Sequence, residues 1–278
     1  MTTCTWTLAH GRSLTLGPRA LIMGILNVTP DSFSDGGRFE QADLAIEQAE
    51  RMLEDGAAII DVGGESTRPG GESVSEREEQ RRVLPVIEAL ASRPDVIISI
   101  DTYREETARR AVACGAHIVN DVWGLQREPG IARVAAQTGA GLVIMHTGRE
   151  RQKLPDVIAD QFSFLRRSVE LAREAGVGAS QIVLDPGFGF AKDPHENIEI
   201  MNRFEELAGL GFPFLVGTSR KRFVGHMTGR EDAAARDAGT AATSVALRLR
   251  GAAVFRVHDV AINRDALKVA DAILAASR

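Results

Sequence analysis

Short apolar segments alternate with longer amphipathic segments along nearly the whole chain. Each short segment is rich in β-branched or aliphatic residues and is bounded by Gly, Asn or Asp, which is typical of a buried strand. The segments lie at residues 21–27, 57–62, 96–101, 117–121, 141–146, 181–186, 213–218 and 252–257. Segments with a helical period lie between them, for example at residues 43–56, 75–90, 104–115 and 157–176. The pattern predicts a series of strand–helix units.

Strands that are apolar throughout and alternate with helices indicate a parallel sheet covered by helices. Eight such units within about 250 residues favour an α/β fold, the (β/α)8 TIM barrel. The alternative is an open doubly wound sheet, which commonly has a glycine-rich turn after its first strand. The first predicted strand instead leads into NVTPDSFSDGG, and GFGF at residues 187–190 lacks the third glycine of a dinucleotide-binding motif. We therefore expect the barrel.

The N-terminal segment has a different pattern. Two short alternating runs flank His10-Gly11, which predicts a β-hairpin. We expect residues 1–20 to form this hairpin and to cover the lower end of the barrel. Residues 21–278 are then expected to form a single barrel domain.

Polar residues mark the ends of most predicted strands. In a TIM barrel the active site is built where the strands end and the following loops begin. Asp and Asn also end strands for structural reasons, because they cap helices and begin turns, so a single such residue indicates little. The whole series, together with Asp-Pro-Gly-Phe-Gly-Phe and Ser-Arg-Lys, indicates a site at one rim. In chain order the strand-end residues are Asn27, Asp61, Asp101, Asn120, His146, Asp185, 217–221, Arg256 and His258.

Basic side chains follow the last two predicted strands. The segment VGTSRKRFVG at residues 216–225 brings Thr, Ser, Arg and Lys to the start of a helix. Alternation places Arg256 and His258 on the same side of the last strand. TIM barrels often bind phosphate at these two loops. Two arginines, a lysine and a histidine supply charge-assisted donors, so we expect a phosphate or pyrophosphate here.

Hydrogen-bond acceptors end three of the middle strands. Asp101, Asn120 and Asp185 should converge on the barrel mouth, where a buried carboxylate needs donors. Such acceptors suit a heterocycle that carries an amino group beside a ring N–H. Three hydrophobic side chains are placed to line this ring: Met145, Phe188 and Phe190. We expect the acceptors to lie deep in the barrel and the cations to lie above them.

The loops after the first two predicted strands are long and rich in glycine. Residues 27–39 and 63–73 combine Gly, Ser, Thr and Pro with acidic residues, Asp in the first and Glu in the second, and with one arginine in each. Such loops can fold over a ligand and offer backbone N–H groups to anionic oxygens. Phe33 and Phe39 favour this interpretation, because exposed aromatic rings in a polar loop gain little unless they cover something.

Composition narrows the class of protein. With 33 Lys+Arg against 38 Asp+Glu the net charge is −5, which argues against nucleic-acid binding through an overall basic surface. No apolar run approaches the roughly 20 residues that a membrane span needs, and the first residues lack a signal-peptide pattern. Cys4 and Cys114 have no metal or disulfide spacing. We expect a cytoplasmic enzyme with small-molecule substrates, no nucleic acid and no membrane partner.

Six motifs resemble one known family. MGILNVTPDSFSDGG, DVGGESTRPG, HIVNDVWG, DPGFGF, VGTSRK and RVHDV occur in this order from about residue 21 onward. They resemble the dihydropteroate synthase family of folate biosynthesis, the target of sulfonamides. The resemblance implies a (β/α)8 barrel, usually a homodimer. It also implies a transferase that joins 6-hydroxymethyl-7,8-dihydropterin pyrophosphate to 4-aminobenzoate, releasing pyrophosphate and forming 7,8-dihydropteroate.

The resemblance also implies roles for individual residues. Asn27 is similar to the family's Mg²⁺-associated residue, with Asp35 a weaker candidate, so Mg²⁺ is the expected cofactor. The implied catalytic residues are Asp101, Lys221, Arg256 and His258. The implied substrate-binding residues include these four together with Phe33, Thr67, Arg68, Pro69, Asn120, Met145, Asp185, Phe190, Gly217 and Ser219. Within that set, Asp101, Asn120, Asp185 and Lys221 resemble pterin contacts, and Phe33, Pro69, Phe190 and Ser219 resemble positions around the aminobenzoate.

Two departures from the family pattern concern the substrates. Arg222 stands where the family commonly has a serine that helps to hold the aminobenzoate carboxylate, so helix N–H groups or Arg222 itself would have to serve. Residues 145–156 (MHTGRERQKLPD) differ from the usual Met-His-Met pattern, so His146 and Thr147 carry little weight as site residues.

Other functions fit the sequence less well. Related barrels that transfer methyl groups from methyltetrahydrofolate need no pyrophosphate clamp. A non-catalytic pterin-binding protein has no support, since every expected catalytic position holds a competent side chain. A zinc hydrolase is disfavoured because His117, His146 and His258 are scattered and form no H-x-H or H-E-x-x-H pair.

Overall fold

The computed structural model describes residues 3–29, 38–65 and 74–276, with the backbone alone described at 38–41. Within these ranges, eight parallel strands form one sheet in the order β8-β7-β6-β5-β4-β3-β10-β9. An isolated parallel bridge between Leu184 and Phe214 joins its two edges and closes the barrel. The strands are β3 (Leu21–Asn27), β4 (Ile59–Gly63), β5 (Ile97–Asp101), β6 (Ile118–Asp121), β7 (Gly141–Met145), β8 (Ile182–Asp185), β9 (Leu215–Val216) and β10 (Val254–Val257). The predicted TIM barrel is confirmed.

Each predicted strand segment contains an observed strand, and β3 has the predicted bounds. The main difference is β9, which is only two residues long where residues 213–218 were expected. Pro213 lacks a backbone N–H and uses its carbonyl to accept a hydrogen bond from Leu184 N, at 2.9 Å. The chain after Val216 leaves the sheet and forms the Ser-Arg-Lys turn of the rim.

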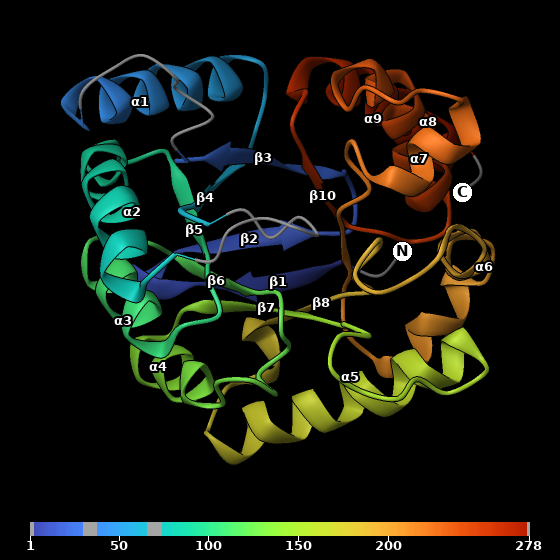
Figure 1. The fold of residues 1–278 in the computed structure, drawn as a ribbon, viewed down its shortest axis with the longest axis horizontal. Helices are drawn as coiled ribbons and strands as arrows, with labels where there is room; N and C mark the ends of the chain where they lie inside the picture. The colour runs from blue at the N-terminus through green and yellow to red at the C-terminus, as the bar shows by residue number, and fades with distance from the viewer. Residues whose placement is uncertain (1–2, 30–37, 66–73, 277–278) are drawn as a thin grey trace.

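Helices surround the barrel on its outer side (Figure 1). Side-chain caps fix several helix starts: Ser75 Oγ accepts from Glu78 N, and Asp156 Oδ1 accepts from Ala159 N. Among the described helices, none is long and apolar enough to cross a membrane. The helices are α1 (Arg38–Glu54), α2 (Glu76–Ala91), α3 (Glu105–Ala113), α4 (Gly130–Thr138), α5 (Val157–Glu174), α6 (Pro194–Asn202), α7 (Arg222–Thr228), α8 (Asp237–Leu249) and α9 (Val260–Ala276).

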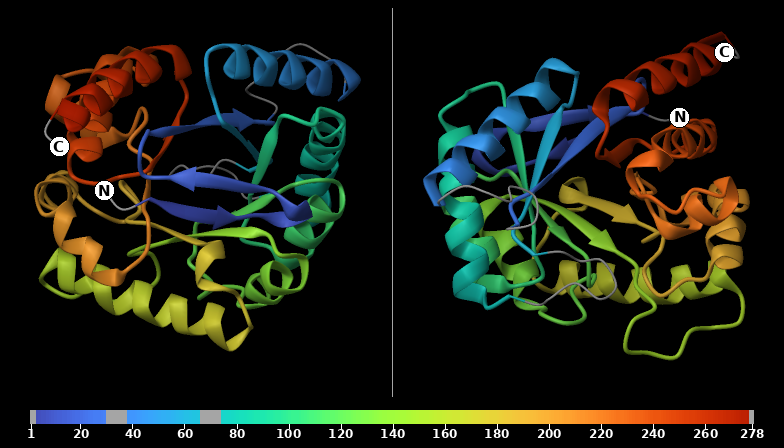
Figure 2. Two further views of the ribbon diagram at one scale, coloured as in Figure 1. Left: turned by 180° about the vertical axis from the view of Figure 1, so that it is seen from behind. Right: turned by 45° about the horizontal axis from the view of Figure 1, so that its top comes forward.

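The N-terminal hairpin lies across the lower end of the barrel, as the view from behind shows (Figure 2). Its strands β1 (Cys4–Thr7) and β2 (Ser13–Leu16) pair antiparallel. Trp6 Nε1 donates a hydrogen bond of 2.8 Å to the carbonyl of Gln181. The apolar layer at this end consists of Trp6, Leu8, Leu16, Met23, Ile59, Ile97, Ile118, Val143, Val183, Leu215, Ala253 and Val254. The hairpin expected from the sequence is confirmed, and the division into domains at 1–20 and 21–278 stays a prediction.

Candidate active site

The interior of the barrel changes from apolar to polar within two residues on five of its strands. Side chains two positions apart point to the same face of a strand, so the residue two positions after an apolar interior residue also points inward. On β4, β5, β6, β8 and β10 this second residue is polar, and the strands are parallel, so the polar residues lie at the same end of the barrel. They are Asp61, Ser99, Asn120, Asp185 and Arg256.

The strand register brings four rim residues into one row. Asn27 pairs with Gly63, Gly63 pairs with Asp101, and Asp101 pairs with Asn120. A Cβ on Gly63 would lie 3.8 Å from both Asn27 Oδ1 and Asp101 Oδ2. The oxygens of Asn27 and Asp101 therefore meet beside a residue without a side chain, which leaves room between them.

Arg256 joins two carboxylates at the floor of this site. Its Nε donates to Asp61 Oδ2 at 2.6 Å and its Nη2 donates to Asp101 Oδ2 at 2.7 Å. Asn120 Nδ2 also donates to Asp61 Oδ2, at 3.2 Å. Asp61 Oδ1 and Asp101 Oδ1 are buried and have no hydrogen-bond partner among the described residues. Each of these oxygens therefore has unused capacity to accept a hydrogen bond.

This arrangement corrects the expectation that the cations lie above the acceptors, because Arg256 is bound to the acceptors themselves. It also identifies Asp61 as a site residue that the sequence analysis named only as a strand end. Its fully buried carboxylate contacts both Arg256 and Asn120. Asp61 was visible in the sequence as a polar residue at the end of a predicted strand. Nothing in the sequence distinguishes it from an aspartate that ends a strand for structural reasons alone.

Burial raises the pKa values of two carboxyl groups of the site toward neutral pH. Burial raises the pKa of Asp101 to about 7, with Arg256 opposing the shift and Asp61 adding to it. Burial likewise raises the pKa of Asp185 to about 6, although Gly187 N donates to Asp185 Oδ1 at 2.7 Å and opposes the shift. Each group gains from a ligand that donates hydrogen bonds to its ionised form.

Lys221 lies beside these carboxylates and against an aromatic ring. Its Nζ is 4.0 Å from the centroid of the Phe190 ring. Burial is the largest of the causes that lower its pKa to about 8; the charge of Arg256 acts in the same direction and that of Asp185 opposes the shift. The lysine belongs to the same electrostatic cluster as Arg256 and Asp185.

The Asp-Pro-Gly-Phe-Gly-Phe segment needs glycine to bring Phe190 to this position. Gly187 has φ 64° and Gly189 has φ 78°, in the left-handed region that favours glycine. A Cβ on Gly187 would lie 1.9 Å from the carbonyl oxygen of His146, so any side chain would force the turn apart. Phe188, expected to line the ligand ring, instead stacks on Phe223 at 5.9 Å between centroids, within the outer core. That expectation was wrong because the turn points successive side chains to opposite sides.

Ser219 and His258 connect the loops that follow β9 and β10. Ser219 Oγ accepts from His258 N at 3.1 Å and lies 2.9 Å from His258 Nδ1. Gly217 lies next to Arg256, since a Cβ at Gly217 would be 3.8 Å from Arg256 Cβ, an ordinary contact distance. The structure thus brings together Gly217, Ser219, Arg256 and His258 at one part of the rim.

One of the expected anion-binding arginines has a different partner. Arg220 has φ 56° and turns its side chain toward α8, where Nε and Nη2 donate to Asp237 Oδ1 and Oδ2 at 2.7 Å each. This bidentate pair holds a left-handed residue between Ser219 and Lys221. Arg220 therefore supports the turn, and the expectation that it donates to a phosphate was wrong.

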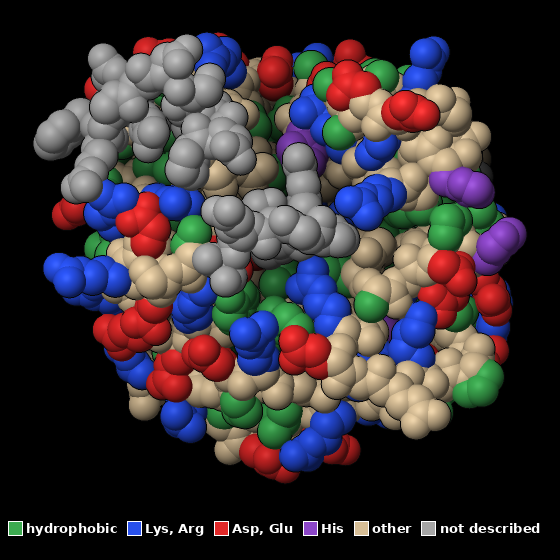
Figure 3. Space-filling view, in the orientation of Figure 1, with side chains coloured by type: hydrophobic (Ala, Val, Ile, Leu, Met, Phe, Trp, Pro, Cys, Tyr) green, Lys and Arg blue, Asp and Glu red, His purple; other side chains and the backbone are tan. Residues whose placement is uncertain are grey.

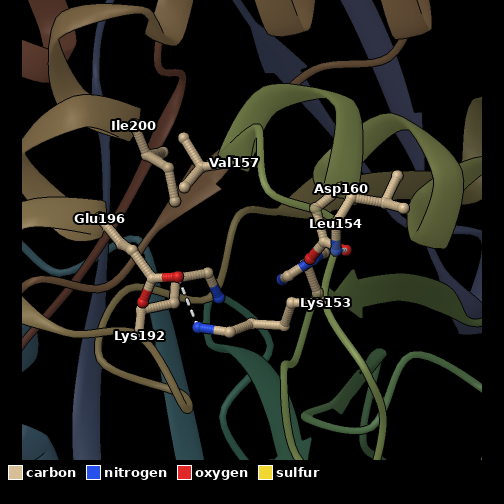
Figure 4. Close-up of a pocket in the computed structure, with 8 residues that line it drawn as sticks. Lys153, Leu154, Val157, Asp160, Lys192, Glu196 and Ile200 are labelled. Carbon is tan, nitrogen blue, oxygen red and sulfur yellow. Dashed lines mark hydrogen bonds and ion pairs between the residues drawn. The ribbon is translucent and has the colours of Figure 1, made fainter.

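A small pocket lies behind the site, next to Lys192 (Figure 4). Lys192 Nζ donates to the carbonyl of Gly187 at 2.8 Å. Burial lowers the pKa of Lys192 to about 7, with Asp185 opposing. The other residues that line the pocket are His146, Lys153, Leu154, Val157, Asp160, Glu196 and Ile200. Lys192 was not among the residues expected at the site, since a lysine in a loop gives no local sign that it will be buried.

His146 belongs to this pocket. It is buried, its Nε2 lies 3.0 Å from Asp160 Oδ2, and burial lowers its pKa to about 3. His146 was given little importance as a site residue, and its side chain contacts Asp160 in this pocket.

Met145 lies in the mouth cluster, which consists of Tyr103, Val122, Trp123, Met145 and Phe190. Four expected substrate-binding residues, and Asp35, lie outside the described residues: Phe33, Thr67, Arg68 and Pro69.

Comparison with known proteins gives one consistent result. A family model described as pterin binding enzyme matches residues 23–258. The dihydropteroate synthase of Bacillus subtilis (strain 168) is 48% identical over 262 residues, which cover 94% of this chain and 91% of the relative.

Solved structures agree. That of Xanthomonas albilineans dihydropteroate synthase with 4-aminobenzoic acid has a TM-score of 0.92 and 43% identity, covering 98% of this chain and 99% of that chain. The same organism's enzyme in complex with 7,8-dihydropteroate has a TM-score of 0.88 and 40% identity, covering 97% and 99%. Both similarities extend over the barrel and its rim.

Proposed function

The chain belongs to the dihydropteroate synthases of the pterin-binding enzyme family, and we propose that the rim described above binds and activates its pterin substrate. The enzyme is a transferase of folate biosynthesis that condenses 6-hydroxymethyl-7,8-dihydropterin pyrophosphate with 4-aminobenzoate. The observation that carries the proposal is the cluster of Asp61, Asp101, Asn120, Asp185 and Arg256 at one end of the barrel. The methyl-transfer alternative has no comparable support.

The buried acceptors suit the donor edge of the pterin. The ring carries an amino group beside a ring N–H, and a carboxylate can accept from both. Asp185 is the proposed partner of this edge, with Asn120 beside it, and the buried Oδ1 of Asp101 accepts from a further ring N–H. Lys221 is the proposed donor to the pterin carbonyl or ring nitrogen, and Met145 packs on the ring.

The diphosphate requires charge-assisted donors, which we assign to Arg256 and His258. Arg256 has five N–H donors and uses two of them on Asp61 and Asp101. Because Ser219 Oγ lies within hydrogen-bond distance of His258 Nδ1, the proposed tautomer of His258 carries its proton on Nε2, where it can donate to a phosphate oxygen. These donors stabilise the negative charge that develops on the leaving group.

The described residues fit a magnesium ion that is held mainly through the substrate. They contain no group of three or more His, Cys, Asp or Glu that could hold a metal unaided. Mg²⁺ usually keeps several waters and takes one or two protein oxygens together with substrate phosphates. Asn27 Oδ1, next to Asp101 across Gly63, is the proposed protein ligand. The bound ion would neutralise charge on the departing diphosphate.

In the proposed reaction, the bond between the pterin methylene carbon and the diphosphate oxygen breaks, and the electron pair leaves with the diphosphate. The amino nitrogen of 4-aminobenzoate forms the new C–N bond and then loses a proton to solvent. Asp101 stabilises positive charge that develops on the pterin as the diphosphate leaves. An arylamine is already nucleophilic at neutral pH, so no strong general base is required.

The test measures 7,8-dihydropteroate and pyrophosphate formed from the two substrates with Mg²⁺. We expect equal amounts of both products. We also expect calorimetric titration with the pterin pyrophosphate to show tighter binding with Mg²⁺ than without it. A folded enzyme that formed no dihydropteroate would contradict the assigned reaction, and Mg²⁺-independent binding would contradict the metal site.

We also propose that the enzyme is a homodimer in the cytoplasm. Support for the dimer comes from α9, which exposes Ile262, Val269 and Ile273. Spacings of seven and four residues place these side chains on one face of the helix, and an apolar face of this kind marks an interaction site. Support for a reducing compartment comes from the free cysteines Cys4 and Cys114.

A further inference from the structure

Arg149, in the loop after β7, lies between two aromatic rings of the barrel mouth. Its guanidinium carbon is 4.5 Å from the centroid of Phe190 and 5.3 Å from that of Trp123. The backbone fixes the loop, because Gly148 N donates to the carbonyl of Phe190 at 3.3 Å and Arg149 N donates to Thr147 Oγ1 at 3.2 Å. Arg149 is therefore held against the mouth rather than extended into solvent.

The rings that hold Arg149 are themselves held in place. Arg127 lies over both Tyr103 and Trp123, at 4.6 Å from each ring centroid. Asp121 accepts from Trp123 N at 2.8 Å and fixes the start of that loop. Cations and aromatic rings thus alternate along this side of the rim. A guanidinium that stacks on aromatic faces keeps its N–H donors in its own plane, an orientation that suits a planar carboxylate.

Arg149 is also close to the reaction centre. Phe190 is one of the two rings that contact Arg149, and Lys221 Nζ lies 4.0 Å from the centroid of the same ring. Burial lowers the pKa of Arg149, and the charge of Asp101 opposes this shift. Lys and Arg side chains lie near the middle of the face opposite the hairpin (Figure 3). A small anion that enters beside Phe190 would meet Arg149 next to Lys221 and Asp101.

The second substrate, 4-aminobenzoate, requires a cationic group that can bind its carboxylate. 4-Aminobenzoate is a flat ring with a carboxylate at one end and the reacting amine at the other. At the start of α7 the chain has Arg222, an exposed residue, instead of a hydroxyl side chain. No described hydrogen bond or ion pair holds the Arg222 side chain in a fixed orientation. Arg149, in contrast, has a defined position between two rings.

We infer that Arg149 binds the carboxylate of 4-aminobenzoate and makes the enzyme specific for an anionic arylamine. This inference rests on the proposed function, since it assigns the binding of that reaction's second substrate. The aromatic ring of the substrate lies by Phe190, its carboxylate meets the guanidinium, and its amine points toward the pterin near Lys221 and Asp101. The neutral amide of the same substrate should lose this interaction.

The experiment compares 4-aminobenzoate with 4-aminobenzamide in Arg149→Met, Arg149→Lys and the unchanged enzyme. Methionine fills the space between the rings without the charge, and lysine keeps a charge without the planar fork. In Arg149→Met we expect the KM for 4-aminobenzoate to rise about ten- to a hundredfold, as for loss of a hydrogen bond to a charged group. The KM values for 4-aminobenzamide and for the pterin pyrophosphate should change less than about threefold. The KM of Arg149→Lys for 4-aminobenzoate should lie between those of the unchanged enzyme and Arg149→Met.

Two further variants serve as comparisons. Arg167→Met changes an arginine on α5 that is 54% exposed and pairs with Glu170, and it should leave every KM unchanged. Arg222→Met tests the rival position and should keep the preference for the carboxylate. Circular dichroism and the melting temperature show whether each variant is folded.

Three results would overturn the inference: an unchanged preference for 4-aminobenzoate in Arg149→Met, an equal loss for both arylamines, or a rise confined to the KM of the pterin pyrophosphate. Loss of the preference in Arg222→Met would assign the carboxylate to Arg222 instead. In each of these cases the unchanged enzyme still forms dihydropteroate, so the proposed function stands. If the unchanged enzyme forms no product, the proposed function and the inference fail together.

Discussion

Asp61 and Arg256 lie 195 positions apart in the chain, and their side chains meet at 2.6 Å on the floor of the barrel mouth. Because Arg256 also donates to Asp101, a cation and two carboxylates form one buried unit. A buried charge that loses its partner is costly, so each member depends on the others. The proposed phosphate-binding and pterin-binding parts of the site are therefore coupled through Arg256.

Asp61 should contribute strongly to activity, although it was not among the expected catalytic residues. Asp61→Asn removes the negative charge opposite Arg256, and we expect kcat/KM for the pterin pyrophosphate to fall about ten- to a hundredfold, equivalent to about 1.4–2.8 kcal/mol. Steady-state kinetics on the folded variant checks this. Activity within about twofold of the unchanged enzyme in Asp61→Asn would show that the pair is only structural.

Pterin affinity should increase with pH through the titration of Asp185. Its pKa is raised to about 6 by burial, so the ionised form that accepts from the pterin is lost below that pH. We expect the affinity of dihydropterin alcohol, measured by calorimetry, to rise between about pH 5 and pH 7. Asp185→Asn should bind about ten- to a hundredfold more weakly and lose most of this dependence, with little change in melting temperature. A variant that kept both the affinity and the slope would remove Asp185 from the site.

The stability of the ligand-free enzyme should change in the opposite direction. Burial raises the pKa of Asp101 from 3.8 to about 7, so the folded protein retains a proton that the unfolded chain has released. The contribution of this group is complete below about pH 3.8 and is lost as the pH rises toward 7. Urea unfolding should therefore give a free energy of unfolding that falls less steeply over this range in Asp101→Asn than in the unchanged enzyme. Parallel curves for the two proteins would contradict the assignment.

Asp237 should support catalysis from outside the site. It holds Arg220 in its left-handed conformation, between Ser219 and Lys221. Asp237→Ala should raise the KM for the pterin pyrophosphate several-fold and destabilise the fold by about 1 kcal/mol, because Lys221 loses its fixed position. Arg220→Gly loses the same ion pair but accepts the positive φ without strain, so it should be the less damaged variant. If Arg220→Gly were the worse enzyme, Arg220 would have a direct role in binding.

The exposed face of α9 should hold two subunits together. Val269 is 60% exposed, the largest exposed fraction among the large hydrophobic residues that the structure describes. Val269→Glu places a charge in this face, and light scattering should then report a monomer where the unchanged enzyme is a dimer. Lys268→Glu, at the neighbouring position, is the control for a charge change on α9. Equal masses for all three proteins would place the subunit contact elsewhere or exclude it.

The sequence located the rim but gave too simple an account of how its residues interact. Asp101 and Asp185 end their strands as expected, and Asn120 and Arg256 lie one residue before the ends of theirs, because apolar runs that end in polar residues are visible locally. Arg220 and Phe188 were assigned to the ligand and belong to the scaffold. Both lie in turns where one residue with positive φ redirects the following side chains, and no periodic pattern predicts that direction.

The sequence by itself determined the barrel, its hairpin and the end at which the chemistry takes place, since periods of 2 and 3.6 residues and the strand ends are local properties of the chain. The tertiary structure decided which polar groups meet. Barrel closure and strand register bring Asp61 to Arg256, Lys192 beneath Gly187 and Arg149 against Phe190. These contacts join residues that are distant in the chain, and their burial, which shifts the pKa values of the site, exists only after the strands have closed into a barrel.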